Sequence, residues 1–187
     1  MPWSNWIGLD QTLSVHAILV KAPVTHSHFA ALKVKDAIVD RIQDDKGRRP
    51  SVDTRNADWN IHILWSQDRV QVSLDSSGDS LHRRGYKVNQ GMAPLNEVLA
   101  AGMVMMTHWD GKGDFIDPFC GSGTILSEAA LIAKNIPANV FRSKFSYQNW
   151  PGFDEEFQNK IWDGLMNRVR EFDYKIYGSD RNMRSIR

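Results

Sequence analysis

The chain has 187 residues and an ordinary apolar fraction of 42%, so it can form one domain or two small ones, and no apolar run is long enough to span a membrane. Its single cysteine, Cys120, excludes an internal disulfide and a cysteine-cluster metal site, and is typical of a reducing, cytoplasmic compartment. With a formal charge of +1, the chain lacks the overall basicity of a protein that holds nucleic acid by charge alone.

The first 76 residues predict a β-α-β-β arrangement. Alternating apolar residues favour strands, and an apolar period near that of a helix follows Ser27, which is placed as an N-cap. The expected elements are a strand over 12–20, a helix over 27–43, an exposed basic loop over 44–56 and a hairpin of strands over 59–65 and 70–74. These strands are few for an independent sheet, so we expect an earlier part of the domain to be missing.

Residues 77–93 form a connector in which basic side chains surround an aromatic one. The cluster consists of His82, Arg83, Arg84, Tyr86 and Lys87. Such a cluster can hold a phosphate backbone and stack a base, although a charged linker is the plainer interpretation. Arg48 and Arg49 in the basic loop allow the same two interpretations, phosphate contact or a solvated surface.

A strand, a glycine loop and a helix follow the connector. Pro94 is well placed in the first turn of a helix whose apolar residues recur at helical spacing from Leu95 to Met106. An apolar strand then ends at Asp117, and after two glycines a second helix occupies 125–133. Glycines let the backbone approach a ligand, and unpaired first-turn N–H groups suit an anionic group. The acidic residue at the strand end suits a ligand rich in donors, such as an amine.

The residue order of the glycine loop distinguishes between several kinds of binding loop. Its residues are Asp117, Pro118, Phe119, Cys120, Gly121, Ser122, Gly123 and Thr124. A phosphate-binding P-loop needs a lysine after its second glycine, but Thr124 follows Gly123 directly. A dinucleotide fingerprint needs a third small residue where Leu126 stands. A glycine-rich turn without a ligand remains possible.

The last part of the chain predicts a long insertion, a helix and a strand. Residues 135–152 are aromatic and basic, and their length argues that they are ordered or functional. Asp154 is placed to cap a helix whose apolar side reaches Phe172. A strand over 174–177 then leads to Asp180, an acidic position that can accept hydrogen bonds from ribose hydroxyls.

Seven segments carry a resemblance to one known family. They are 33–40, 75–79, 82–86, 93–97, 117–124, 150–154 and 178–180. Together they resemble the THUMP-containing guanine-N2 RNA methyltransferases, specifically the bacterial RlmL-like family that modifies large-subunit (23S) ribosomal RNA. Members of this family are also labelled N6-adenine-specific DNA methylases. The resemblance covers nearly the whole chain.

The resemblance implies an α/β protein built from two parts. A partial THUMP RNA-binding domain would occupy 1–76, the connector 77–93, and the N-terminal part of a Rossmann-like methyltransferase domain 94–187. Only the first β-α-β of that sheet would be present, so the chain is expected to be cut at both ends. The implied cofactor is S-adenosylmethionine and the implied partner is RNA, with no metal and no membrane. The oligomeric state is left open.

The resemblance also assigns roles to individual residues. Asp117, Gly121 and Gly123 would shape the pocket for the methionine part of the cofactor. Asp180 would hold the ribose, and Pro94 would close one wall. The remaining cofactor-loop positions are Pro118, Phe119, Cys120, Ser122 and Thr124. The implied RNA contacts are Lys33, Lys35, Arg48, Arg49, Arg83 and Arg84.

One departure concerns catalysis. The family's catalytic tetrapeptide, Asn or Asp followed by two prolines and an aromatic residue, orients the base amine toward the methyl group. No such tetrapeptide occurs among the 187 residues, and Asp117 to Cys120 lacks the second proline. We therefore expect a fragment of a ribosomal RNA guanine-N2 methyltransferase that is inactive alone and has no catalytic residue in this chain. The alternatives are a non-catalytic RNA-binding fragment, an N6-adenine-specific DNA methyltransferase and, more distantly, a nicotinamide oxidoreductase.

Overall fold

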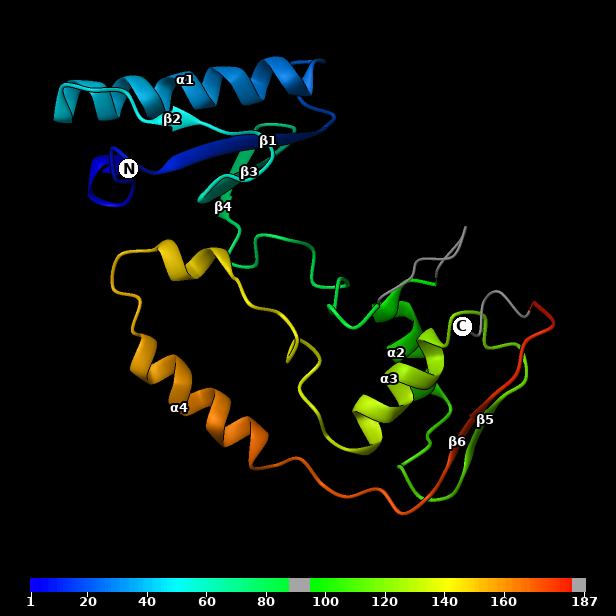
Figure 1. Cartoon of the computed structure of the whole chain (residues 1–187). Coiled ribbons are helices and arrows are strands. Elements are labelled where there is room, and N and C mark those ends of the chain that lie inside the picture. The colour runs from blue at the N-terminus through cyan, green and yellow to red at the C-terminus, as the bar shows by residue number, and fades with distance from the viewer. Residues whose placement is uncertain (88–94, 183–187) are drawn as a thin grey trace. The chain divides into compact units, whose positions relative to one another are not determined.

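A computed structural model describes residues 1–87 and 95–182 of the chain. The chain divides into two compact units, each with its own sheet (Figure 1). The first unit comprises Met1–Gly78 together with Lys144–Phe153. The second comprises Asp79–Ser143 and Asp154–Arg187. The stretch 144–153 therefore belongs to the first unit although it follows most of the second in sequence.

The sheet of the first unit has four strands in the order β2-β1-β3-β4. Their bounds are β1 (Thr12–Val20), β2 (Ser51–Val52), β3 (Trp59–Ser66) and β4 (Arg69–Leu74). β1 pairs in parallel with β2 and β3, and β3 pairs with β4 in antiparallel register. The predicted strand over 12–20 and the predicted hairpin are thus confirmed. β2 lies in the stretch predicted as a loop, and its two residues are too few to show a period.

The helix α1 (Ser27–Lys46) packs along β1 and covers one face of this sheet (Figure 1). A short 3-10 helix, η1 (Trp3–Asn5), precedes β1 in the chain and contacts α1. The prediction that Ser27 caps α1 is wrong, because Ser27 is already helical and His26 holds the N-cap position. The helix also continues beyond Gln43 to Gly47, which ends it at φ 76°, a left-handed conformation that glycine adopts without strain.

The core of the first unit lies between α1 and alternate residues of β1 and β3. Its buried members are Ile7, Leu13, Ile38, Val39, Ile42, Trp59, Ile61 and Ile63. Trp150 packs against this core, and its ring stacks on that of Trp59 with centroids 5.7 Å apart. A second short 3-10 helix, η2 (Ser146–Asn149), leads to Trp150. Part of the aromatic insertion is therefore ordered by packing in the first unit.

The described residues of the second unit form a parallel pair of strands and three helices. The bounds are α2 (Glu97–Met106), β5 (Phe115–Asp117), α3 (Thr124–Ala133), α4 (Glu155–Met166) and β6 (Ile176–Gly178). β5 pairs with β6 so that Asp117 lies opposite Gly178. None of the helices in the described ranges is both long and apolar enough to cross a membrane.

The face of α2 that is buried differs from the face predicted by its apolar period. Ala100 and Val104 are buried, and α2 packs against α3. The larger apolar side chains Val98, Leu99, Met103 and Met106 are 43% to 79% exposed. The helix begins at Glu97, and the side chain of Asn96 caps it by accepting the N–H groups of Val98 and Leu99. Pro94, predicted for the first turn, lies outside the described residues.

The helix α4 begins as predicted but is shorter. The Asp154 carboxylate accepts the N–H of Phe157 at 2.9 Å, which confirms the predicted cap. The helix ends at Met166, although its predicted apolar side reached Phe172. Phe172 instead packs edge-on against Trp109, with ring centroids 5.9 Å apart. The apolar spacing of α4 therefore continues past the end of the helix, because Phe172 belongs to an aromatic cluster.

Candidate cofactor site

The glycine loop connects the end of β5 to the start of α3. Gly121 and Gly123 have φ values of 54° and 77°, in the left-handed region that glycine adopts without strain. Gly123 is also the N-cap of α3 and has no side chain to bond the first-turn N–H groups. These N–H groups have no partner within the helix, by the geometry of a helix start. The loop can therefore present backbone donors to a carboxylate or phosphate group.

The segment after β6 lies against this loop. Ser179 donates its N–H to the Asp117 carbonyl at 3.0 Å, and Cys120 donates to the Ser179 carbonyl at 2.9 Å. The Asp180 carboxylate accepts the N–H of Gly121 at 2.8 Å. Asp117 and Asp180, both predicted as site residues, are thus brought to one edge of the strand pair. Hydrogen bonds from the N–H groups of Asn182 and Gly121 hold the pKa of Asp180 below its usual value.

The Asp117 side chain has one free acceptor. Its Oδ1 accepts the N–H of Phe119 at 3.0 Å. Its Oδ2 is buried and has no hydrogen-bond partner within residues 1–87 and 95–182. A buried oxygen without a donor is unfavourable, so such atoms are normally satisfied by water or by a ligand. This oxygen fits a ligand that carries an amine or another strong donor.

Close packing explains the glycine at the end of β6. A Cβ atom on Gly178 would lie 2.3 Å from Leu126 Cδ1 and 3.0 Å from Cys120 Sγ. Distances this short are not compatible with a side chain at this position unless both neighbours move. The absence of a side chain lets β6 lie against the glycine loop. Phe119, by contrast, points its ring into solvent, and Pro94, the predicted wall of the pocket, is not among the described residues.

We expect the Cys120 thiol to react slowly with iodoacetamide at neutral pH. Burial, followed by the charges of Asp117 and Asp180, raises the pKa of this thiol. The thiolate is the reactive form. The reaction rate of Cys120 should therefore rise only at a pH above the pKa of an ordinary cysteine thiol, about 8.5. Mass spectrometry of the carbamidomethylated protein across pH, with glutathione as the reference thiol, measures this. A Cys120 profile that coincides with that of glutathione would contradict the prediction.

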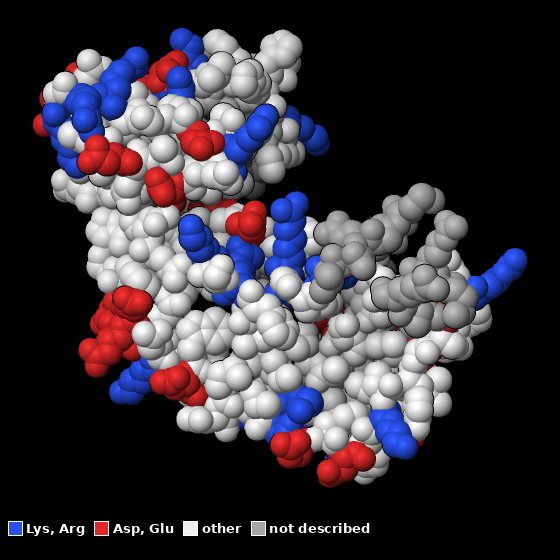
Figure 2. Space-filling model, viewed as in Figure 1, with Lys and Arg blue, Asp and Glu red and all other residues white. Residues whose placement is uncertain are grey.

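Most of the predicted RNA-contacting cations lie beside acidic side chains. Figure 2 shows Lys and Arg side chains interspersed with Asp and Glu on the visible face. The pairs are Lys35 with Asp36 at 2.6 Å, Arg48 with Asp10 at 2.6 Å, Arg49 with Asp40, and Arg83 with Asp79 at 3.8 Å. Lys33 lies over the ring of Phe29. All of these cations except the half-buried Lys35 are exposed, but a phosphate would have to compete with the neighbouring carboxylates.

Arg84 has different surroundings from Arg83. Its side chain is only 11% exposed, and its Nε lies 3.5 Å from Glu128 Oε1. The hydroxyl of Tyr86 donates to the same carboxylate oxygen at 2.8 Å. A guanidinium buried against a carboxylate is poorly placed to face a phosphate backbone. We therefore keep Arg83, but not Arg84, as a proposed RNA contact. Sequence spacing could not show this, because Glu128 lies far along the chain.

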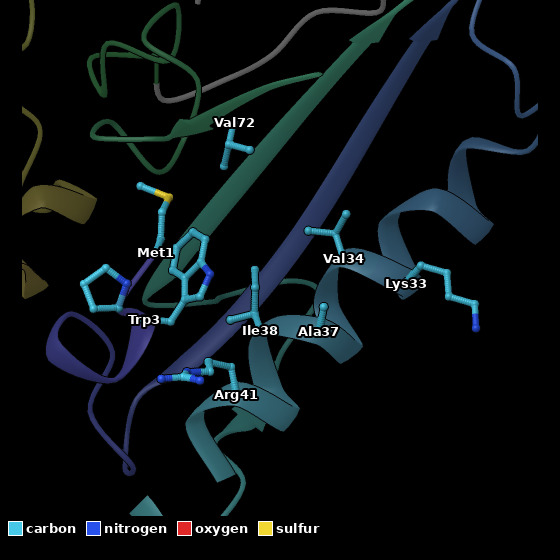
Figure 3. A pocket seen from close by; sticks show the side chains of 9 residues that line it. Met1, Trp3, Lys33, Val34, Ala37, Ile38, Arg41 and Val72 are labelled. Carbon is cyan, nitrogen blue, oxygen red and sulfur yellow. The ribbon is translucent and has the colours of Figure 1, made fainter. Parts of the chain in front are cut away.

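A cavity of about 870 Å³ lies in the first unit, where no motif predicted one (Figure 3). Its lining is mainly apolar and comes from η1, α1 and β4, with Trp3, Ile38 and Val72 among its residues. Arg41 extends toward the indole of Trp3, whereas Lys33 points away (Figure 3). Arg41 is also paired with Asp45 at 3.1 Å. The lining contains neither an acidic nor a nucleophilic side chain, so we assign no chemistry to it.

Comparisons with known proteins agree with the two units. Residues 1–75 match the family profile described as THUMP domain, and residues 84–187 match the profile described as RMKL-like, methyltransferase domain. The ribosomal RNA large subunit methyltransferase K/L of Desulfotalea psychrophila is 42% identical over 173 residues. That alignment covers 90% of this chain and 23% of the relative.

Two solved structures are similar over nearly the whole chain. A predicted N6-adenine-specific DNA methylase from Listeria monocytogenes superposes with a TM-score of 0.85 and 30% identity, covering 98% of this chain and 48% of that one. SMU.472, described as a methyltransferase and solved in complex with SAH, gives a TM-score of 0.83 and 28% identity, covering 98% and 48%. The chain thus spans about half the length of these proteins.

The family and fold predicted from the motifs are confirmed by these matches. The methyltransferase profile extends over residues 84–187, more than half of the chain, and includes the glycine loop, β5, α3 and β6. The THUMP profile covers β1, α1, β2, β3 and β4. The chain therefore belongs to the RMKL-like methyltransferase family and carries a THUMP domain ahead of its methyltransferase domain.

Proposed function

We propose that this protein is an S-adenosylmethionine-dependent RNA methyltransferase that modifies the exocyclic N2 amine of a guanine in large-subunit ribosomal RNA. The observation that carries the cofactor assignment is the free, buried Asp117 Oδ2 at the edge of the glycine loop. The methionine part of the cofactor has an ammonium group that would satisfy this oxygen. The related SMU.472 was solved with SAH, which supports the same ligand class.

Different residues around the loop would bind different groups of the cofactor. Asp117 would accept hydrogen bonds from the ammonium group, and the first-turn N–H groups of α3 would bind its carboxylate. Asp180 would accept from the ribose hydroxyls, since each of its oxygens has a second lone pair. Pro94 is proposed as one wall. When bound, the cofactor supplies a methyl group already activated by its sulfonium, so the task of the protein is to hold and orient.

The RNA side of the proposal rests on the THUMP domain and on the name of the related rRNA methyltransferase. The proposed phosphate contacts are Lys33, Lys35, Arg48, Arg49 and Arg83. Since most of these cations have a neighbouring carboxylate, we propose that RNA binding exchanges these weak surface pairs for phosphate contacts. Such binding should weaken steeply with added salt.

The catalytic tetrapeptide is a separate element of the proposal. Its sequence is absent from the 187 residues, and the chain spans only 23% of the K/L relative and 48% of the two similar structures. We propose that residues outside this stretch orient the base amine. The 187 residues alone would then hold cofactor and contact RNA without transferring a methyl group.

A methylation assay tests the proposed substrate. The whole protein is incubated with labelled S-adenosylmethionine and either ribosomal RNA from a strain lacking the gene or unmodified duplex DNA. We expect N2-methylguanosine in the RNA after nucleoside digestion, and no label in the DNA. Label in N6-methyladenine of the DNA would support the DNA methylase alternative, to which the name of the Listeria structure points. Salt-sensitive RNA binding without any transfer would support a non-catalytic role.

A further inference from the structure

A buried ionic cluster is centred on α3, the helix that follows the glycine loop, and the proposed cofactor contacts do not use it. The cluster, called here the Glu128 cluster, consists of Arg84, Tyr86 and Glu128. Glu128 is 2% exposed, and its Oε1 accepts the Tyr86 hydroxyl at 2.8 Å and pairs with Arg84 Nε at 3.5 Å. Burial and the hydrogen bond to Glu128 raise the pKa of Tyr86, so its hydroxyl remains a donor. Charges this well buried are costly unless they are paired.

The position of Glu128 connects this cluster to the loop. Glu128 is on α3, one helical turn after Thr124, the buried first residue of the helix. The N-cap before it, Gly123, has no side chain that could hold the first turn. One turn further along the helix, Glu128 carries a buried hydrogen bond to Tyr86 and an ion pair with Arg84. A shift of this helix would move the N–H groups that the loop presents.

The partners of Glu128 are themselves held in place. Arg84 also donates through Nη1 to the Leu81 carbonyl at 3.2 Å. A second buried pair follows on the connector, where Lys87 Nζ lies 3.0 Å from Glu97 Oε1 at the start of α2. Because α2 packs against α3, both pairs fix residues 84–87 to the two helices. Residues 84–87 thus support α3 through buried pairs.

We propose that Glu128 is a positioning residue of the cofactor loop, and that it orients the first turn of α3 by anchoring the helix to Arg84 and Tyr86. It would act through the helix, by fixing the direction of the donors that would receive the cofactor carboxylate. Small errors in the placement of such donors weaken binding even when the site is otherwise intact. This inference rests on the proposed cofactor site.

Two paired variants separate positioning from simple stability. In one, Arg84→Met is combined with Glu128→Gln, which removes both charges and keeps an acceptor for Tyr86. In the other, Arg84→Met is combined with Glu128→Met, which removes both charges and the acceptor. Replacing a buried ion pair by uncharged groups of similar volume is often neutral for stability. Both proteins should therefore fold, as checked by circular dichroism and thermal unfolding.

Calorimetric titration of the whole protein with S-adenosylhomocysteine gives the decisive readout. We expect the Gln variant to bind within about 3-fold of the unaltered protein and the Met variant to bind about 10-fold more weakly, as for loss of a buried hydrogen bond. Equal affinity of the two variants would overturn the inference. A failure of the unaltered protein to bind at all would instead overturn the proposed cofactor site, and this inference with it.

The opposite end of α3 provides the control. Arg170 Nε donates to the carbonyl of Ala133, the last residue of the helix, at 2.6 Å. Arg170→Ala should lower the melting temperature and leave the affinity for S-adenosylhomocysteine within about 2-fold, because it releases the end remote from the loop. If Arg170→Ala weakened binding as much as the Met pair, general loosening of α3 would explain both results and the inference would be wrong.

Discussion

The Asp117→Ala variant is expected to bind S-adenosylhomocysteine about 100-fold more weakly than the unaltered protein, because hydrogen bonds to charged groups contribute about 1.5–3 kcal/mol. Two losses combine in this variant. The buried Oδ2 would no longer receive the ammonium group of the ligand, and Oδ1 would no longer hold the N–H of Phe119 in the loop. Isothermal titration calorimetry of the whole protein measures the change directly.

Two further variants show which property of Asp117 matters. Asp117→Asn keeps one acceptor oxygen but removes the charge, so we expect an intermediate loss of about 10-fold. Asp114→Ala is the matched control, since Asp114 accepts the N–H of Lys175 at 2.9 Å at the other end of the same strand pair. Its affinity should stay within about 2-fold of the unaltered protein. If Asp117→Ala bound as tightly as Asp114→Ala, the assignment of the pocket would fail.

The resemblance assigned Asp117 and Asp180 to one cofactor, and both residues follow short apolar runs. Parallel strands place their carboxyl ends at one edge, which brings the two acidic residues together in the structure. The free oxygen of Asp117 could not be predicted, because it depends on which backbone N–H group each carboxylate oxygen accepts. The sequence thus named the proposed members of the site, but not the hydrogen bonds that leave one acceptor of Asp117 free.

Where the structure changes the interpretation of the sequence, the reason is a partner that lies far along the chain. Arg84 stands in the basic cluster proposed to face RNA, but its partner Glu128 lies on α3. The apolar period of α2 pointed to its large side chains, yet the smaller Ala100 faces α3 because it permits close packing. Local periodicity determines which side of a helix is apolar, and tertiary contacts determine which side is buried.

The stretch 144–153 gives the clearest example, because it contributes to the core of the first unit. Trp150 stacks on Trp59, and Gln11 connects the same two regions. Its Oε1 accepts Trp59 Nε1 at 2.9 Å, while its Nε2 donates to the Asn149 carbonyl at 3.0 Å. The aromatic insertion and the strand over 59–65 were both predicted, but the packing of one on the other was not, because the two lie far apart in the sequence.

The largest stability effect is therefore expected for Trp59→Ala. Trp59 is 1% exposed, and removal of a buried tryptophan costs about 3–5 kcal/mol through lost apolar contact and the cavity left behind. Trp150→Ala should cost less, about 1–2 kcal/mol, because Trp150 packs on the edge of the core and its removal exposes one face of Trp59. Chemical unfolding followed by circular dichroism measures both values.

Hydrogen exchange localises the effect of Trp150→Ala and gives this prediction its sharpest test. We expect faster amide exchange in β1 and β3, which hold Trp59 in the sheet, and unchanged exchange in α3 of the second unit, because the stacked pair belongs to the first unit alone. Trp6→Ala is the matched control, since Trp6 is 42% exposed and should change neither region. Faster exchange confined to α3 would show that residues 144–153 support the second unit instead. Faster exchange in β3 would show that this late segment completes the core formed by the first 78 residues.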